Sequence, residues 1–143
     1  MKSGQFTFSM IKPTAFHNKH AGEIITKIYE HGFHIIAMKM TRLSYAEAQL
    51  FYKVHQDRPF YDDLCKFMSS GPIIALILIK ENAVEDYRKI IGSTDPNRAD
   101  EGTIRNVFGL NIQQNAVHGS DSDENALHEA RFFFSELEIY KNA

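Results

Sequence analysis

The sequence predicts an α+β fold in which helices cover an antiparallel sheet, and three segments carry this prediction. Residues 5–12 alternate apolar and polar side chains as a strand does, and Pro13 ends the strand because it lacks a backbone donor. Residues 21–31 carry isoleucines at helical spacing and stop at Gly32. Residues 73–79 are apolar and rich in β-branched side chains, which is typical of a central strand.

Further elements are expected between these segments. Residues 33–41 read as a second strand. Ser44 is followed three residues later by Glu47, which is the pattern of a capping box and opens a predicted helix over residues 45–54. A short helix is expected over residues 60–68.

The second half of the chain begins with a predicted helix that Asn82 caps and Gly92 ends. Residues 93–102 contain no large apolar side chain, so we expect a solvated loop there. A loop of this length in so small a domain suggests a functional role. Residues 103–108 are expected to form a helical turn.

A short extended piece around Val117 and His118 comes next, followed by a helix that Ser122 caps. The inner face of that helix is expected to consist of Ala126, Leu127, Ala130, Phe133 and Phe134. The order β-α-β, extra helices, β-α-β-α predicts a ferredoxin-like α/β sandwich with a four-stranded antiparallel sheet covered by helices.

The size and composition suit one compact domain spanning residues 1–143. The chain is 43% hydrophobic and 24% charged, which is ordinary for a globular protein. No apolar run approaches the ~20 residues of a membrane-spanning helix, and the N-terminus lacks the apolar core of a secretory signal. The one cysteine, Cys65, fits a reducing compartment, so we expect a cytoplasmic protein without a membrane partner.

The charge pattern argues against a general nucleic-acid binder. The formal net charge is −2, and the basic residues are spread along the chain. A nucleotide- or RNA-binding module on the same topology is the alternative. An RNA-recognition module needs paired aromatics in a strand, which neither residues 5–11 nor residues 73–79 supply. We therefore expect no requirement for nucleic acid, although a few converging cations would suffice for a small polyanion.

Familiar phosphate and hydrolase motifs are absent from the sequence, including the P-loop, the dinucleotide fingerprint and the nucleophile elbow. Two histidine pairs have a three-residue spacing, His17 with His20 and His31 with His34. Neither pair has cysteine or acidic partners at matching positions, so we expect ordinary surface histidines and no dedicated protein metal site.

The residues around His118 favour a catalytic role for its side chain. Gly119 follows it and allows a close backbone approach, and the polar run beyond leads to a helix N-terminus, where an anion binds well. Glu129 lies about two helical turns after Ser122 and could hold one imidazole nitrogen, which leaves the other free as a nucleophile. Asn115 offers an amide for a hydroxyl group. The alternative is a structural loop with a capping serine and an exposed histidine.

Three cations lie at the ends of predicted elements around the polar loop. Lys12 closes the first strand, Arg88 lies late in a helix, and Arg105 follows the loop. Each could be a solvated surface charge, but together they suggest a phosphate site.

Taken together, these residues resemble the nucleoside diphosphate kinase family over essentially the whole chain. The resemblance rests on the run Asn115-x-x-His118-Gly119-Ser120-Asp121-Ser122 and on further blocks in the same order. These blocks are Ile11-Lys12-Pro13, Arg58-Pro59-Phe60, Met68-x-Ser70-Gly71-Pro72, Asn82-Ala83-Val84, Thr94-Asp95-Pro96 and Gly102-Thr103-Ile104-Arg105.

The resemblance implies ping-pong transfer of a γ-phosphoryl group from a nucleoside triphosphate, such as ATP or GTP in ribo or deoxyribo form, to a nucleoside diphosphate. His118 would be the phosphorylated nucleophile, oriented by Glu129 and Ser120. Lys12 would contact the transferring phosphate and the ribose 3′-hydroxyl, which Asn115 would also bind. The other implied contacts are Tyr52, Arg88, Thr94 and Arg105 for the phosphates, and Phe60, Leu64 and Ile112 for the base.

The family also implies Mg²⁺ bridging the nucleotide phosphates and a homo-oligomer, either a tetramer or a hexamer. Structural roles remain the alternative for three of the implied contacts: Phe60 as a core residue, Tyr52 packed on a helix face, and Thr94 as a turn cap. A catalytically silent relative is another alternative, which the intact motif disfavours. The departures from the family pattern are Glu101, Val107, Ile79 and Lys80, which bear on loop rigidity and oligomer contacts.

Overall fold

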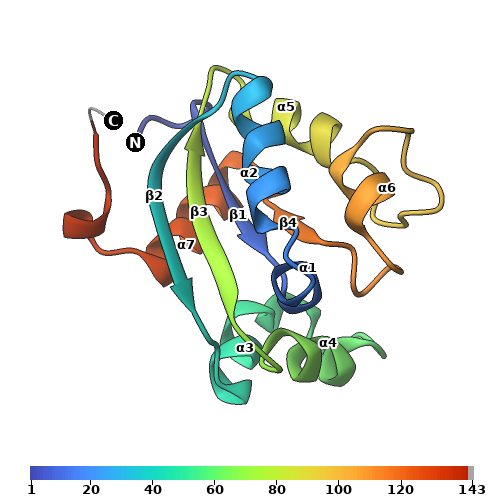
Figure 1. Ribbon diagram of the computed structural model, residues 1–143. Helices are drawn as coiled ribbons and strands as arrows, with labels where there is room; N and C mark the ends of the chain where they lie inside the picture. The colour runs from blue at the N-terminus through green and yellow to red at the C-terminus, as the bar shows by residue number, and fades with distance from the viewer. Residues whose placement is uncertain (142–143) are drawn as a thin grey trace.

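The computed structural model describes residues 1–141, so positions 142 and 143 of the expected domain lie outside the described residues. Its centre is a four-stranded sheet (Figure 1). The strands are β1 (Phe6–Ile11), β2 (His34–Thr41), β3 (Ile73–Ile79) and β4 (Val117–Gly119). They lie in the order β2-β3-β1-β4, and every neighbouring pair is antiparallel. This order confirms the predicted ferredoxin-like sandwich.

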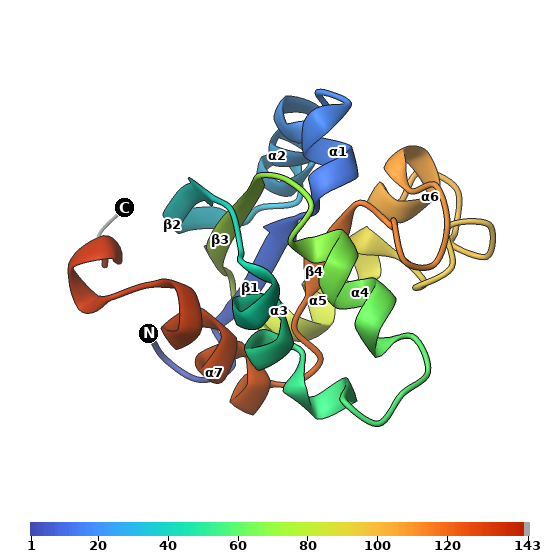
Figure 2. The ribbon, with the colours of Figure 1, turned by 90° about the horizontal axis from the view of Figure 1, so that it is seen from below.

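Helices cover both faces of the sheet (Figures 1 and 2). The helices are α1 (Pro13–His17), α2 (Ala21–Glu30), α3 (Tyr45–Phe51), α4 (Tyr61–Met68), α5 (Ala83–Ile91), α6 (Ile104–Phe108) and α7 (Asp123–Phe133). No helix within residues 1–141 is both long and apolar enough to cross a membrane.

The alternation in β1 divides the interior into two cores. Phe6, Phe8 and Met10 face a core completed by α3, α4 and α7. Ile11 faces the opposite side, where α2, α5 and α6 contribute the buried side chains. Both cores depend on β1 and β3, which are the two inner strands of the sheet. The prediction of β3 as a central strand is therefore confirmed.

Most predicted helix boundaries hold, with three differences. Pro13 does not only end the strand; it also begins the short helix α1, because its fixed φ suits the first helical position. The helix predicted over residues 45–54 ends at Phe51 and gives way to a short 3₁₀ turn. Asn82 precedes α5 as predicted, but its φ is +56°, and its side chain donates to Glu85 instead of capping the helix.

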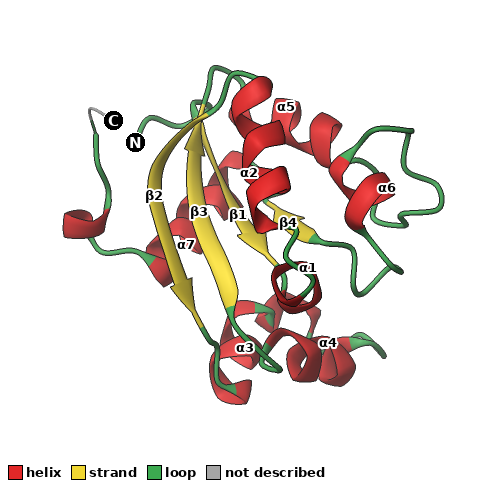
Figure 3. Ribbon diagram, in the orientation of Figure 1, coloured by secondary structure: helices red, strands yellow, loops and turns green. Residues whose placement is uncertain are grey.

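The other capping predictions agree with the structure. The side chain of Ser44 accepts from the backbone N–H of Glu47 in a capping box, and Ser122 accepts from that of Asn125 at the start of α7. The expected loop over residues 93–102 is irregular and leads into α6 (Figure 3). A second loop connects α6 to β4, so the loops on either side of α6 lie beside the edge of the sheet that β4 forms.

Gly92 is the point where backbone conformation most restricts the sequence. Its φ is +87° and its ψ is −175°, a region that is essentially confined to glycine. A Cβ added there would lie 2.5 Å from Oγ1 of Thr103. We expect Gly92→Ala to lower the free energy of unfolding by about 2–4 kcal/mol, from backbone strain together with the clash, in a urea titration.

The matched control is Gly22→Ala, because nothing lies within 4 Å of a Cβ at that helical position. Alanine there should leave stability unchanged or raise it by up to about 1 kcal/mol, since glycine is a poor helix former. Equal stability for the two variants would contradict the conformational argument.

Candidate active site

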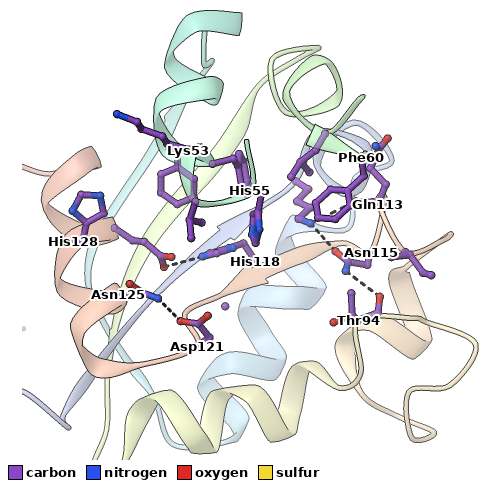
Figure 4. Close-up of a pocket in the computed structure, with 18 of the residues that line it drawn as sticks. Lys53, His55, Phe60, Thr94, Gln113, Asn115, His118, Asp121, Asn125 and His128 are labelled. Atoms are coloured by element: carbon purple, nitrogen blue, oxygen red, sulfur yellow. Dashed lines mark hydrogen bonds and ion pairs between the residues drawn. The ribbon is translucent and has the colours of Figure 1, made fainter. Parts of the chain in front are cut away.

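A cleft of about 750 Å³ lies at the edge of the sheet that β4 forms (Figure 4). Segments from the whole chain line it, from the end of β1 to α7. The structure brings eleven of the twelve expected site residues to its wall: Lys12, Tyr52, Phe60, Leu64, Arg88, Thr94, Arg105, Ile112, Asn115, His118 and Glu129. The twelfth, Ser120, is fully buried behind Glu129.

His118 is the central residue of β4 and is paired in register with Met10 of β1. Its side chain is 17% exposed, so the ring is largely enclosed yet still accessible from the cleft. Aromatic rings enclose it: the ring centroids of Phe8 and Phe51 lie 5.9 and 5.5 Å from that of His118. The imidazole is therefore held in one place by packing as well as by polar contacts.

The hydrogen bonds of His118 fix its tautomer. Its Nε2 lies 2.8 Å from Oε1 of Glu129. An ionised carboxylate can only accept, so Nε2 carries the hydrogen and Nδ1 has a lone pair. The hydroxyl of Ser120 donates to the same Oε1 at 2.7 Å and accepts from the backbone N–H of Phe8. Ser120 thus orients Glu129, and through it the imidazole.

The backbone just before His118 is strained. Ala116 has a φ of +76°, a conformation that L-residues with a side chain rarely adopt. The N–H of Val117 donates to the carbonyl of Asn115, which closes a tight turn around Ala116. Lys12 donates its backbone N–H to the carbonyl of Ala116, so β1 holds this turn in place. Strained residues of this kind cluster at active sites.

Lys12 is buried at the end of β1 and has no carboxylate partner among the described residues. Its Nζ donates to Oδ1 of Asn115 at 2.8 Å, and Nδ2 of Asn115 donates to the carbonyl of Thr94 at 3.1 Å. Burial, together with the nearby charge of Arg105, lowers the pKa of Lys12 to about 7. An anion in the cleft would offset this cost by pairing with the ammonium group.

Arg105 is also buried, and burial lowers its pKa to about 10, so it stays charged at neutral pH. Its Nη1 and Nη2 each donate at 3.1 Å, to the carbonyls of Gly92 and Val117 respectively. Its Nε has no partner within the described part of the chain, and neither has the hydroxyl of Tyr52. Unpaired buried donors are costly, and both side chains lie on the wall of the cleft.

The other end of the cleft is apolar. Phe60 is 48% exposed and Ile112 is 60% exposed, while Leu64 is buried beside them. Phe60 is therefore not a core residue, which was the alternative to a stacking role. Exposed flat and branched apolar groups that line one cleft can hold a planar ring between them.

The structure also adds cleft residues that sequence reasoning missed. The carboxylate of Asp121 accepts a hydrogen bond from Asn125, and Figure 4 shows both side chains below His118. The ring of His55 lies between those of Tyr52 and Phe60, at 6.4 and 5.6 Å. Asp121 could have been found from its place in the motif with His118. The sequence around His55 gave no comparable signal.

The cleft has no group of three or more metal-ligating side chains in the part of the chain that the structure describes. Asp121 is the carboxylate on the wall that is free of a histidine or cationic partner within residues 1–141.

Comparison with known proteins gives a consistent result. The family model for nucleoside diphosphate kinase matches residues 5–139. A nucleoside diphosphate kinase of Flavobacterium psychrophilum is 56% identical over 94% of this chain and 96% of its own length. A second, from Persephonella marina, is 51% identical over 93% of this chain and 95% of its own.

Solved structures lead to the same family. The Aquifex aeolicus nucleoside diphosphate kinase superimposes with a TM-score of 0.92 at 41% identity, covering 94% of this chain and 98% of that one. A halophilic enzyme of Halobacterium salinarum, solved in complex with CDP, superimposes with a TM-score of 0.90 at 31% identity, covering 96% and 92%. The fold, the cleft and these similarities agree: this chain belongs to the nucleoside diphosphate kinase family.

Proposed function

We propose that this protein transfers the γ-phosphoryl group of a nucleoside triphosphate to a nucleoside diphosphate through a phosphohistidine at His118. Such an activity maintains the pools of nucleoside triphosphates. The observation that carries the proposal is the tautomer of His118: Nε2 is bonded to Glu129, so Nδ1 is the nitrogen with a free lone pair. The family assignment supports the same chemistry.

The reaction is two symmetric displacements. Nδ1 of His118 attacks the γ-phosphorus, the bond from that phosphorus to the β–γ bridging oxygen breaks, and the nucleoside diphosphate departs with the electron pair. The ring gains positive charge as the N–P bond forms, and the carboxylate of Glu129 at 2.8 Å stabilises that charge. The second nucleoside diphosphate then attacks the phosphohistidine with its terminal oxygen and restores the free imidazole.

The cations of the cleft would compensate the negative charge of the phosphates. A loose phosphoryl-transfer transition state needs alignment and electrostatic stabilisation more than covalent chemistry. Lys12 would contact the transferring phosphate, and Arg88 and Arg105 would hold the phosphates beside it. Tyr52 and Thr94 would donate hydroxyl hydrogens to phosphate oxygens. The unpaired Tyr52 hydroxyl and Arg105 Nε support this assignment.

The rest of the nucleotide would occupy the apolar end of the cleft. Asn115 and Lys12, which are hydrogen-bonded to each other, would share the ribose 3′-hydroxyl. The base would stack on Phe60, with Ile112 on its other face and Leu64 beside it. Every base has a π face, so stacking gives little selectivity among purines and pyrimidines. This fits acceptance of ATP, GTP and other ribo- and deoxyribonucleotides.

Mg²⁺ is the expected cofactor, bridging the nucleotide phosphates. The donor set of the cleft fits a metal held mainly by substrate oxygens and water, because Asp121 is its only carboxylate without a histidine or cationic partner in the described residues. When bound, Mg²⁺ would neutralise phosphate charge, and Asp121 would help to hold it in the cleft.

Assembly and compartment complete the proposal. We infer a homo-oligomer, either a tetramer or a hexamer, from the family. A cytoplasmic location agrees with Cys65, which is free and buried in the hydrophobic core. The family assignment favours this enzyme over an RNA-binding module, and the complete set of motif residues at one cleft favours it over a silent relative.

The nucleophile can be tested by labelling. Incubation with γ-labelled ATP and Mg²⁺ should give a stoichiometric, acid-labile and base-stable phosphoenzyme. His118→Ala should take up no label, since the attacking nitrogen is gone. His128→Ala is the matched control, because His128 lines the same cleft and is exposed, and it should be labelled as wild type. Stoichiometric label on His118→Ala would overturn the assignment.

The shifted pKa of Lys12 predicts a pH-dependent stability. The folded protein releases this proton near pH 7 and the unfolded chain near 10.5, so the unfolded state binds more protons between these values. Stability therefore rises with pH across that window. From about pH 6 to about pH 9, wild type should gain roughly 2.7 kcal/mol of unfolding free energy relative to Lys12→Met, measured by urea titration.

Nucleotide binding should show the opposite trend. The phosphates favour the protonated amine, so binding of ADP should weaken above about pH 7 and should be accompanied by proton uptake. Calorimetry in buffers of different ionisation enthalpy measures that uptake directly. Lys12→Met should lose both the uptake and most of the affinity. Identical proton uptake in the variant would show that another group titrates.

A further inference from the structure

Two buried hydroxyls lie behind the active-site strand, on the face of the sheet opposite the side chain of His118. Oγ of Ser9, in β1, lies 2.7 Å from the hydroxyl oxygen of Tyr87, in α5, and both side chains are fully buried. Oγ of Ser9 also donates to the backbone carbonyl of His118 at 2.8 Å. Ser9 has only one hydroxyl hydrogen, so Tyr87 must be the donor in the first bond. The three groups form a directed chain from α5 to His118.

Tyr87 also packs directly against the strand. A Cβ added to Gly119 would lie 3.2 Å from the ring of Tyr87 and 2.8 Å from Ile91, so only glycine allows this close approach. Phe33 meets the Tyr87 ring edge-on, with the centroids 5.6 Å apart. Since Tyr87 is enclosed in this way, its hydroxyl is a fixed anchor for Ser9.

β4 needs such an anchor. It is an edge strand of three residues, paired on one side only, and it follows the strained turn at Ala116. Its contacts with β1 and α5 therefore decide where the backbone of His118 lies. Arg88, which lines the cleft, directly follows Tyr87 in α5. The hydrogen bonds from Tyr87 through Ser9 to His118 therefore also set the distance between the Arg88 cation and His118.

We propose that Ser9 and Tyr87 are positioning residues for phosphoryl transfer, which hold the backbone of His118 so that Nδ1 stays in line with the γ-phosphate. The inference rests on the proposed role of His118. Neither hydroxyl reaches the cleft, so both act through the carbonyl of His118. Positioning of this kind matters because small displacements of a reacting group cost large factors in rate.

The test separates positioning from simple stability with three variants. Ser9→Ala removes the bond to His118 and leaves the Tyr87 hydroxyl buried without its partner, so it should lose both stability and rate. Tyr87→Phe keeps the ring packing and leaves Ser9 able to donate to His118. The double variant Ser9→Ala/Tyr87→Phe removes the orphaned hydroxyl and should recover stability, but the carbonyl of His118 still lacks Ser9.

Rapid-mixing measurement of His118 phosphorylation by ATP gives the rate. We expect a loss of about 10-fold for Ser9→Ala and for the double variant, and of about 3-fold or less for Tyr87→Phe. The KM for ATP should stay within about 2-fold of wild type, because the nucleotide contacts are untouched. A double variant that recovers the rate along with the melting temperature would overturn the proposal.

Thr7→Val is the matched control. Thr7 lies in β1 two residues before Ser9, and its buried hydroxyl has no partner among the described residues. Removing that hydroxyl should leave the rate at the wild-type value. An equal fall in rate for Thr7→Val and Ser9→Ala would show a general response of β1 and would also overturn the proposal.

Hydrogen exchange gives a readout that does not need activity. The backbone amides of His118 and Gly119 should exchange faster in Ser9→Ala and in the double variant than in wild type, and should be unchanged in Thr7→Val. If wild-type protein took no label at His118, the proposed function would fail, while the exchange data would still report on the anchor. Unchanged exchange in Ser9→Ala would count against the anchor itself.

Discussion

The pairing of β4 with β1 is the constraint on which the active site depends. β4 has three residues, and its register sets His118 opposite Met10. The same pairing places the end of β1, and with it Lys12, beside the turn at Ala116. A strand this short contributes little pairing energy of its own. Its position is therefore determined by the side chains on either face, Glu129 and the aromatic rings on one, Ser9 and Tyr87 on the other.

The cleft illustrates how binding capacity reduces stability. Lys12 and Arg105 are buried without a carboxylate partner in the described residues, and the Tyr52 hydroxyl lacks any hydrogen bond there. The burial of each of these groups lowers the free energy of unfolding unless a partner compensates it. Under the proposed function, the phosphates of a nucleotide would supply acceptors to these groups. The arrangement that lowers stability would then also favour the binding of a polyanion with several acceptors.

Sequence reasoning was most successful where a local pattern decides the outcome. The strand alternation around Phe8 and the cap at Ser44 were predicted correctly, because the period of 2 and the capping hydrogen bond are properties of short segments. It failed at Asn82, whose backbone is left-handed and whose side chain donates to Glu85 instead of capping the helix. The site residues came mainly from family resemblance. The Ser9–Tyr87 bond joins residues 78 positions apart, and no local pattern encodes such a contact.

The buried lysine has a consequence for chemical reactivity. An amine whose pKa is near 7 is largely neutral at mildly alkaline pH, whereas a lysine with an ordinary pKa stays protonated and unreactive. Lys12 is therefore a nucleophile as well as a charge. Under the proposed function, phosphates in the cleft would favour the protonated amine, so an amine-directed reagent should modify Lys12 more slowly when a nucleotide is present. The burial that lowers the pKa of Lys12 thus also makes this amine more open to chemical modification at mildly alkaline pH than an ordinary lysine.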